Sequence, residues 1–387
     1  MEMPTVVISP YRTLEFVEGG GHFWVYMQYA HSLQQLGCEV YWVERYYGQD
    51  AGPDGSRVTA LLQRLKRYGL ENKVIFCTDA SGDRGQGREY DYIGVTRSEA
   101  EEVFKRADLL LNFHYAIDPE FLAFFRRTAL VDIDPGLLQK WMSTGQLPVA
   151  PHDIYLTTGE TVGTRSALFP DCGVEWAHIR PPVCLDLWPY TYDPGSEAFT
   201  TVTSWWTGYA TETIGGREAA YDNNKRTAYL AFAELPRWTS QPLELALHLA
   251  ADETEDRQTM ERHGWRLRSS IEMTGTPETY RSYIQHSRGE LSCVKPSCVK
   301  LQNGWISDRS LCYLASGKPV VMQDTGPNPY VPFGEGIFRF STPEEAAEAL
   351  ATVNADYEKH CRRAREIAET YFDARQAAEK ILNVALA

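Results

Sequence analysis

The sequence lacks long apolar runs and has no excess of basic residues. No apolar segment reaches the ~20 residues that a membrane-spanning helix needs, and the first residues carry no basic region of the kind that opens a signal peptide. Lys and Arg number 38 and Asp and Glu number 52, so the net charge is −14. A chain this acidic has no general attraction for nucleic acid or anionic lipid. We therefore expect a cytoplasmic protein with no nucleic-acid partner and no membrane span.

Residue spacings typical of metal sites are also scarce. None of the eight cysteines forms a CxxC pair, and the closest two, Cys293 and Cys298, have no histidine at zinc spacing. Apart from Asp132-Ile133-Asp134, no Asp-x-Asp pattern lies in a suitable loop. We expect reduced thiols and no metal site.

Short β-type runs alternate with amphipathic helical stretches through the first half of the chain. A strand at 6–9, a glycine-rich loop, a helix of about 15 residues and a strand at 39–43 form one parallel strand–helix–strand unit. The unit repeats with strands at 74–76, 109–111 and 129–133. This pattern predicts a doubly wound sheet.

A proline-rich passage at 180–189 separates this half from a second one. The alternation restarts with strands at 199–203, 243–249 and 319–322 and helices at 225–235, 277–286 and 308–316, and we expect a long polar loop between 206 and 223. Residues 343–385 are predicted to be nearly all helix. The predicted fold class is α/β, with two Rossmann-like domains that face each other across a cleft.

The loop between the first strand and the first helix contains Gly19-Gly20-Gly21-His22. Glycines let a ligand approach the backbone closely, but the pattern is not GxGxxG, so it does not favour a nicotinamide dinucleotide site. His22 is placed at the helix N-terminus, where the helix dipole disfavours the imidazolium. A neutral His22 could accept a proton near pH 7. The alternative is a loop or capping histidine with no chemistry.

The most informative segment of the second half is 304–321. Ser307 is predicted to cap a helix of about nine residues that ends at a glycine and leads into a buried strand. Free amides at such a helix start form a cradle for an anion. Arg309 lies in this helix start, and Lys295 and Lys300 precede it. These cations in an acidic chain favour a phosphate site over an ordinary capped helix.

Two motifs resemble those of glycosyltransferase-B-fold enzymes of the plant and antibiotic-decorating type. Gly21-His22, with Gly37 placed 15 positions after the histidine, resembles their amino-terminal motif, and 304–321 is similar to their nucleotide-sugar motif. The resemblance covers nearly the whole chain. It implies an acceptor domain at 1–184, a donor domain at 185–365, and a C-terminal helix at 366–387 that packs back on the first domain.

The resemblance also implies roles for individual residues. His22 would be the base that deprotonates an acceptor hydroxyl, and Asp118 would be the carboxylate that orients it. A Gln-Asp pair at the end of the strand 319–322 suits sugar hydroxyls. The residues implied in donor binding are Gly20, Gly21, Lys225, Lys295, Lys300, Ser307, Asp308, Arg309, Ser310, Gln323, Asp324 and Thr325.

The implied function is transfer of a sugar from a nucleoside diphosphate sugar to a hydroxyl of a small aromatic or apolar acceptor. No metal or cofactor is implied, inversion of the anomeric centre is expected, and a homodimer is compatible with the resemblance. Segments 45–100 and 136–180 would form acceptor loops, with Asp132 and Asp134 either contacting the acceptor or capping a turn. The aromatic residues of these loops include Tyr46, Tyr47, Tyr90, Tyr92 and Trp141.

Two other functions stay open. One is a nucleotide-sugar epimerase on the same fold. The other is a non-catalytic partner of another glycosyltransferase, which is suggested by Gln302 at the position where the family has a phosphate-binding histidine.

Overall fold

The structure is a computed structural model that describes residues 3–46, 55–79, 90–214, 217–250 and 252–387. Its first half contains a sheet in the order β4-β3-β2-β1-β5-β6-β7-β8, parallel except for the antiparallel pair β3–β4. The strands are β1 (Thr5–Ser9), β2 (Glu39–Arg45), β3 (Val74–Asp79), β4 (Tyr90–Ile93), β5 (Leu109–Asn112), β6 (Thr128–Asp132), β7 (Ile154–Thr157) and β8 (Trp176–His178). The helices are α1 (Gly20–Gln35), α2 (Ser56–Arg67), α3 (Arg97–Arg106), α4 (Pro119–Leu122) and α5 (Leu137–Thr144).

The second half contains a six-stranded parallel sheet in the order β13-β12-β9-β14-β15-β16. The strands are β9 (Phe199–Thr203), β12 (Leu243–Leu247), β13 (Arg266–Ser269), β14 (Gly289–Ser292), β15 (Val320–Gln323) and β16 (Ile337–Phe340). The helices are α6 (Lys225–Ala231), α7 (Thr254–His263), α8 (Ser270–Thr274), α9 (Pro277–Gln285), α10 (Pro296–Leu301), α11 (Asp308–Ala315) and α12 (Pro343–Ala355). The doubly wound α/β fold class predicted from the sequence is confirmed.

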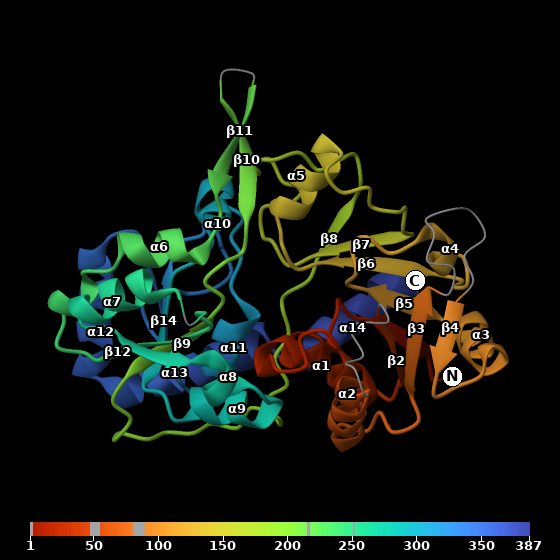
Figure 1. The fold of residues 1–387 in the computed structure, drawn as a ribbon, viewed down its shortest axis with the longest axis horizontal. Coiled ribbons are helices and arrows are strands. Elements are labelled where there is room, and N and C mark those ends of the chain that lie inside the picture. The colour runs from red at the N-terminus through yellow and green to blue at the C-terminus, as the bar shows by residue number, and fades with distance from the viewer. Residues whose placement is uncertain (1–2, 47–54, 80–89, 215–216, 251) are drawn as a thin grey trace.

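Both sheets change winding direction at their first strand. β1 lies between β2 and β5, and β9 lies between β12 and β14. Ligands of doubly wound sheets bind beyond the carboxyl ends of the strands at such a reversal, because neighbouring loops diverge there. A ligand site is therefore expected at the loops after β1 and β9. Figure 1 shows the two sheets side by side with α1 between them.

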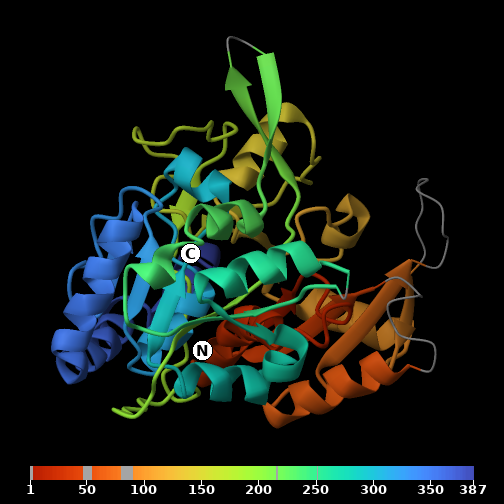
Figure 2. The same cartoon turned by 60° about the vertical axis from the view of Figure 1, so that its left-hand side comes forward.

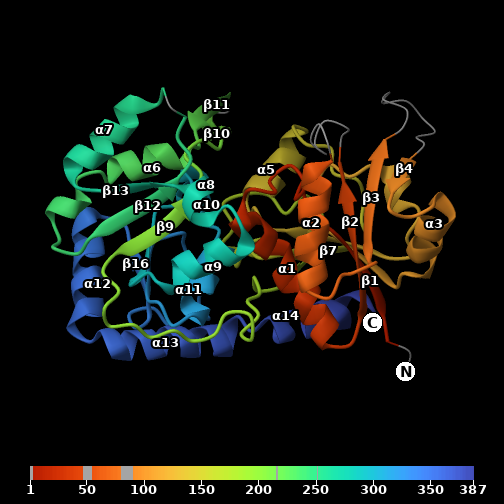
Figure 3. The ribbon, with the colours of Figure 1, turned by 60° about the horizontal axis from the view of Figure 1, so that its bottom comes forward.

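The helical tail crosses from the second half to the first. It consists of α13 (Tyr357–Tyr371) and α14 (Ala374–Ala385), which run one after the other below both halves in Figure 3. α14 packs against α1. The predicted contact of the tail with the first half is thus present, although the crossing helix begins at Ala374 rather than at 366, because the chain breaks its helix at 372–373 and pairs there with Val183.

The segment predicted as a long polar loop is a hairpin. β10 (Tyr209–Ile214) and β11 (Arg217–Asp222) pair antiparallel and project away from both sheets (Figure 2). The loop prediction was wrong because a two-stranded ribbon has no core to bury, so its sequence carries little apolar alternation. The hairpin lies between β9 and α6 in the chain and so borders the carboxyl end of β9.

Candidate functional site

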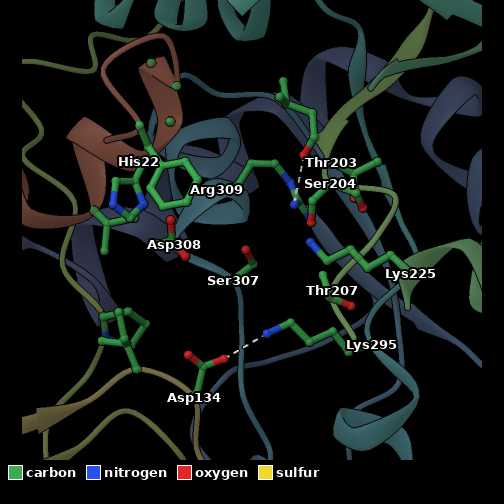
Figure 4. Close-up of a pocket in the computed structure, with 18 of the residues that line it drawn as sticks. His22, Asp134, Thr203, Ser204, Thr207, Lys225, Lys295, Ser307, Asp308 and Arg309 are labelled. Atoms are coloured by element: carbon green, nitrogen blue, oxygen red, sulfur yellow. Dashed lines mark hydrogen bonds and ion pairs between the residues drawn. The ribbon is translucent and has the colours of Figure 1, made fainter. Parts of the chain in front are cut away.

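A cavity of about 650 Å³ lies between the two halves, at the carboxyl ends of β1 and β9. We call it the cationic cavity, because Lys225, Lys295 and Arg309 line one side of it. The first turn of α1, with Gly20, Gly21 and His22, and the loop before it line the other side. The starts of α6, α10 and α11 thus meet the start of α1 across this space (Figure 4).

A second cavity of about 510 Å³ lies in the first half. We call it the aromatic cavity, and its wall is mostly aromatic and aliphatic: Tyr11, Val25, Tyr26, Phe113, Tyr115, Ala116, Ile133, Trp141 and Leu147, with His22, Asp134 and Gln146. His22, Val25, Ile133 and Asp134 line both cavities. His22 therefore stands on the wall that the two cavities share.

His22 lies in the first turn of α1, and its ring is fixed by a backbone group. Its Nε2 lies 2.7 Å from the carbonyl oxygen of Tyr11. A carbonyl oxygen only accepts hydrogen bonds, so Nε2 carries the hydrogen and Nδ1 keeps a lone pair. Burial lowers the pKa of His22, while the bond to Tyr11 opposes this effect. The ring is therefore neutral near pH 7 and able to accept a proton at Nδ1.

Glu44 at the end of β2 holds the loop that carries Tyr11. This fully buried carboxylate accepts hydrogen bonds from Leu14 N at 2.8 Å, from Trp42 Nε1 at 3.2 Å and from the hydroxyl of Thr13. Burial raises the pKa of Glu44 to about 7. Glu44 thus fixes the loop through hydrogen bonds, and these bonds account for a buried carboxylate at the end of β2 without a bound dinucleotide.

The three cations of the cationic cavity differ in their partners. Arg309 donates to Glu290 at 2.5 Å, to Ser292 at 2.6 Å and to the carbonyl oxygen of Val202 at 3.1 Å, so its charge is neutralised within the second half. Lys295 donates to Asp134 in the first half at 2.9 Å. Asp134 accordingly raises the pKa of Lys295.

Lys225 has no side-chain partner among the described residues and lines the cationic cavity. Burial, with the nearby charges of Arg309 and Lys295, lowers its pKa to about 7. The Oδ1 atom of Asn223 accepts a hydrogen bond from Ser297 N at 2.8 Å, which joins the starts of α6 and α10. Lys225, at the start of α6, therefore lies beside α10. Lys225 is the ammonium group that is ready to bind an anion in this cavity.

The start of α11 adds backbone donors to the same wall. Ser307 is the N-cap, as predicted, but its side chain makes no capping hydrogen bond. The first amides of an α-helix have no partner within the helix, so they can bind an anion that lies at this end of the helix axis. Ser307, Asp308 and Arg309 all line the cationic cavity.

The structure does not bring Asp118 to His22. Asp118 is the N-cap of α4 and forms an ion pair with Arg45 at the end of β2. It lines neither cavity. The expected His–Asp pair is replaced by the bond from His22 to the Tyr11 carbonyl, because the loop after β5 carries Asp118 toward β2 instead of toward α1.

Five predicted donor residues lie outside the lining of the cationic cavity. Lys300 lies on α10 with its ammonium 4.9 Å from the ring centre of Tyr221, and Ser310 is buried in α11. Gln323 accepts from Val294 N, Asp324 pairs with Arg339, and Thr325 donates to the carbonyl oxygen of Trp305. Thr325 thus holds Trp305, which itself lines the cavity.

Asp132 and Asp134, each predicted either to contact the acceptor or to cap a turn, lie in different environments. Asp132 is fully buried and accepts from Gln139 at 2.8 Å, from Thr157 at 2.9 Å and from the amide of Asp134 at 3.0 Å, so it shapes the turn. Asp134 lines both cavities.

Of the aromatic residues predicted in the acceptor loops, some line a cavity and others lie in the core. Trp141 lines the aromatic cavity, whereas Tyr46 and Tyr90 are buried in the core and Tyr92 packs against it. Tyr47 lies outside the described residues. Sequence reasoning missed Tyr11, Tyr26, Phe113 and Tyr115, although each lies in or beside a segment that follows a predicted strand or contains His22.

The described part of the chain holds neither a metal-ligand cluster nor a membrane-spanning helix. No three His, Cys, Asp or Glu side chains gather there in the manner of metal ligands. No helix there has both the length and the apolar character needed to cross a bilayer.

Several solved structures share this fold over nearly their whole length. The sucrose-phosphate synthase of Thermosynechococcus elongatus has a TM-score of 0.59 at 11% sequence identity, with 98% of both chains covered. The Anabaena protein HepE, solved in complex with UDP-glucose, has a TM-score of 0.57 at 12% identity, with 99% of both chains covered. AviGT4, a glycosyltransferase involved in avilamycin A biosynthesis, has a TM-score of 0.53 at 14% identity, covering 98% of this chain and 96% of its own.

The sequence identity between this chain and these structures is low, at 11–14%. No protein-family model matches it, and no curated protein matches it. The likeness in structure extends over both halves and the helical tail. The chain therefore has the glycosyltransferase-B fold, as its sequence predicts.

Proposed function

We propose that the protein transfers a sugar from a nucleoside diphosphate sugar to a hydroxyl group of a small aromatic or apolar acceptor. The observation that carries this proposal is the position of His22 on the wall shared by a cationic cavity and an aromatic cavity. A base at such a boundary can take a proton from a group bound on one side while that group attacks a molecule bound on the other.

The cationic cavity suits the donor. Lys225 and the free amides of α11 would hold the diphosphate, and Lys295 lies within the same wall. These positive groups would stabilise the charge that develops on the leaving diphosphate, a task that needs no metal ion when fixed donors are already in place. HepE, with UDP-glucose bound in its solved structure, supports a donor of this class.

The aromatic cavity suits the acceptor. Its ring-lined wall favours a flat or apolar molecule, and its volume of about 510 Å³ is that of a small-molecule site. In the proposed reaction the acceptor oxygen forms a bond to the anomeric carbon, and the bond from that carbon to the diphosphate oxygen breaks. The electron pair leaves with the diphosphate, and the hydroxyl proton passes to Nδ1 of His22. A single displacement of this kind inverts the anomeric centre.

The test compares two histidines on the same helix. His22→Ala is expected to lower turnover about 100-fold, within the usual range for loss of a general base, while the affinity for UDP or TDP in calorimetry stays within about twofold. His31→Ala is the matched control, because His31 lies on α1 but pairs with Asp186 at 2.8 Å and lines neither cavity. Unchanged turnover in His22→Ala would exclude His22 as the base.

The two other functions are separated by simpler experiments. An epimerase would convert UDP-glucose or a TDP-sugar into an isomer without any acceptor, and chromatography of the sugar nucleotide would show it. A non-catalytic partner of another glycosyltransferase would bind neither diphosphate in calorimetry. Lys225, with its lowered pKa and without a side-chain partner among the described residues, favours a ligand-binding protein over that last function.

A further inference from the structure

Asp134 has no role in the reaction proposed above. It is the carboxylate that lines both cavities, and its Oδ1 accepts from Lys295 Nζ at 2.9 Å. The two residues belong to different halves of the molecule, so this ion pair spans the cationic cavity (Figure 4).

The backbone around Asp134 is held firmly. The amide of Asp134 donates to Asp132 Oδ1 at 3.0 Å and to the hydroxyl of Tyr115 at 3.1 Å, and Asp132 is itself fully buried among further hydrogen-bond donors. Tyr115 lines the aromatic cavity. The carboxylate of Asp134 is therefore presented from a fixed turn, at the boundary where an acceptor hydroxyl would lie.

Lys295 is the cation of this wall that can change partner. Arg309 is committed to Glu290, Ser292 and a backbone carbonyl, all within the second half. Lys295 instead carries a compact ammonium on a flexible stem, and such a group exchanges one anionic partner for another readily. A diphosphate in the cationic cavity would compete with Asp134 for it.

We propose, on the basis of the donor binding proposed above, that Asp134 links the two cavities by releasing Lys295. Without a donor, Lys295 is bound to Asp134. When the diphosphate binds, the ammonium of Lys295 turns to the phosphate, and the released carboxylate accepts a hydrogen bond from the acceptor hydroxyl. Asp134 is then a positioning residue for the acceptor that becomes available only after the donor has bound, which makes donor-first binding the preferred order.

Calorimetry with UDP and TDP on a double-mutant cycle tests the exchange. Asp134→Asn is expected to tighten diphosphate binding about two- to fivefold, because Lys295 no longer has to leave a carboxylate. Lys295→Met is expected to weaken binding about tenfold or more. Without Lys295, Asp134→Asn should tighten binding less than it does in the parent protein, because only the repulsion between the carboxylate and the diphosphate is removed and no lysine is released.

Glu278→Gln is the matched control. Glu278 also forms an ion pair between the two halves, with Arg67 at 2.7 Å, but it lines neither cavity. If Glu278→Gln tightens diphosphate binding as much as Asp134→Asn does, the effect comes from loosening the two halves and the exchange is refuted. Equal tightening by Asp134→Asn with and without Lys295 refutes it as well.

The acceptor part is tested with 2-naphthol as an aromatic hydroxyl probe. Saturating diphosphate is expected to tighten 2-naphthol binding to the parent protein about threefold or more, and to have no such effect on Asp134→Asn. Equal probe affinity with and without diphosphate, or no binding in either state, overturns this part. If neither diphosphate binds the parent protein, the proposed function itself fails; if one binds and the cycle shows no coupling, only the present inference fails.

Discussion

At the scale of single residues, the protonation state of His22 follows from burial and from one backbone carbonyl. A carboxylate partner would stabilise the imidazolium and raise the pKa of the histidine. Here the partner is the carbonyl oxygen of Tyr11, which carries only a partial charge. Burial is the larger effect and lowers the pKa of His22 below its ordinary value.

The pH profile of turnover should show this directly. A base with a lowered pKa stays neutral to lower pH, so the acid limb of kcat/KM is expected below the ordinary histidine value of about 6.5. On this limb, activity is lost as the pH falls through the pKa of His22 in the free enzyme. A profile measured from pH 5 to 8 checks this, and an acid limb at pH 7 or above would indicate a charged partner for His22.

Lys225 should couple donor binding to proton uptake. Its pKa of about 7 leaves most of the side chain neutral at pH 8, and a bound diphosphate favours the protonated form. Binding of UDP at pH 8 is therefore expected to take up close to one proton, and the affinity should fall as the pH rises above about 7. Calorimetry in buffers of different ionisation enthalpy measures the uptake.

The controls for this prediction are two lysine substitutions. Lys225→Met should abolish most of the proton uptake. Lys300→Met should leave it unchanged, because Lys300 lies outside the lining of the cationic cavity. Equal uptake in the parent protein and in Lys225→Met would show that another group takes the proton.

At the scale of elements, α1 begins in direct contact with the other half. A Cβ atom on Gly20 would lie 2.6 Å from the carbonyl oxygen of Thr274, and closer still to that of Thr276. Trp24 one turn later donates to the carbonyl oxygen of Pro277 at 2.9 Å. Glycine at the start of α1 is therefore required by the close approach of α8 and α9, in addition to any ligand contact.

Gly20→Ala is expected to destabilise the protein by about 1–3 kcal/mol, the usual cost of overpacking, because backbone atoms must shift. Gly195→Ala is the control, since its nearest neighbour is the side chain of Asp193 at 3.2 Å. Chemical denaturation of both variants measures the difference. Equal stability of Gly20→Ala and the parent protein would show that the contact between the halves gives way easily.

The sequence predicts strands that are rich in apolar or β-branched residues and misses strands that are not. β1, β5 and β9 are fully or almost fully buried and were placed correctly. β14 was missed although it is central, because Leu291 is the one large apolar side chain among its four residues; the structure buries Glu290 against Arg309.

The residues of the candidate site could also be predicted only in part. His22 and Lys225 were predicted because motifs mark the starts of their helices, and Lys295 was predicted as a cation in the loop before the helix at 308–316; all three line the cationic cavity. The partner of His22 could not be found, because a backbone carbonyl leaves no signature in the sequence and because the path of the loop 113–118 decides where Asp118 lies. Asp134 was open to two interpretations, since its pairing with Lys295 joins segments from different halves.

At the scale of the whole molecule, the helical tail makes the first half depend on the end of the chain. Ile381 on α14 is fully buried in the same cluster as Leu33 on α1. Ile381→Ala is expected to cost about 2–5 kcal/mol, as for other buried aliphatic truncations. Leu382→Ala, at a partly buried position on the same helix, should cost less. Urea denaturation followed by fluorescence measures both, and a cost below about 1 kcal/mol for Ile381→Ala would show that α14 contributes little to the first half.

The same contact bears on how the chain folds during its synthesis. α1 leaves the ribosome early, but the helix that covers part of its apolar side is made only after the whole second half. Domains generally fold in the order in which they are translated, and uncovered apolar surface in a partly made chain is prone to aggregate. The first half therefore stays incompletely covered until residues 374–385 have emerged, so slow translation of the second half should lengthen the time for which this apolar surface is exposed.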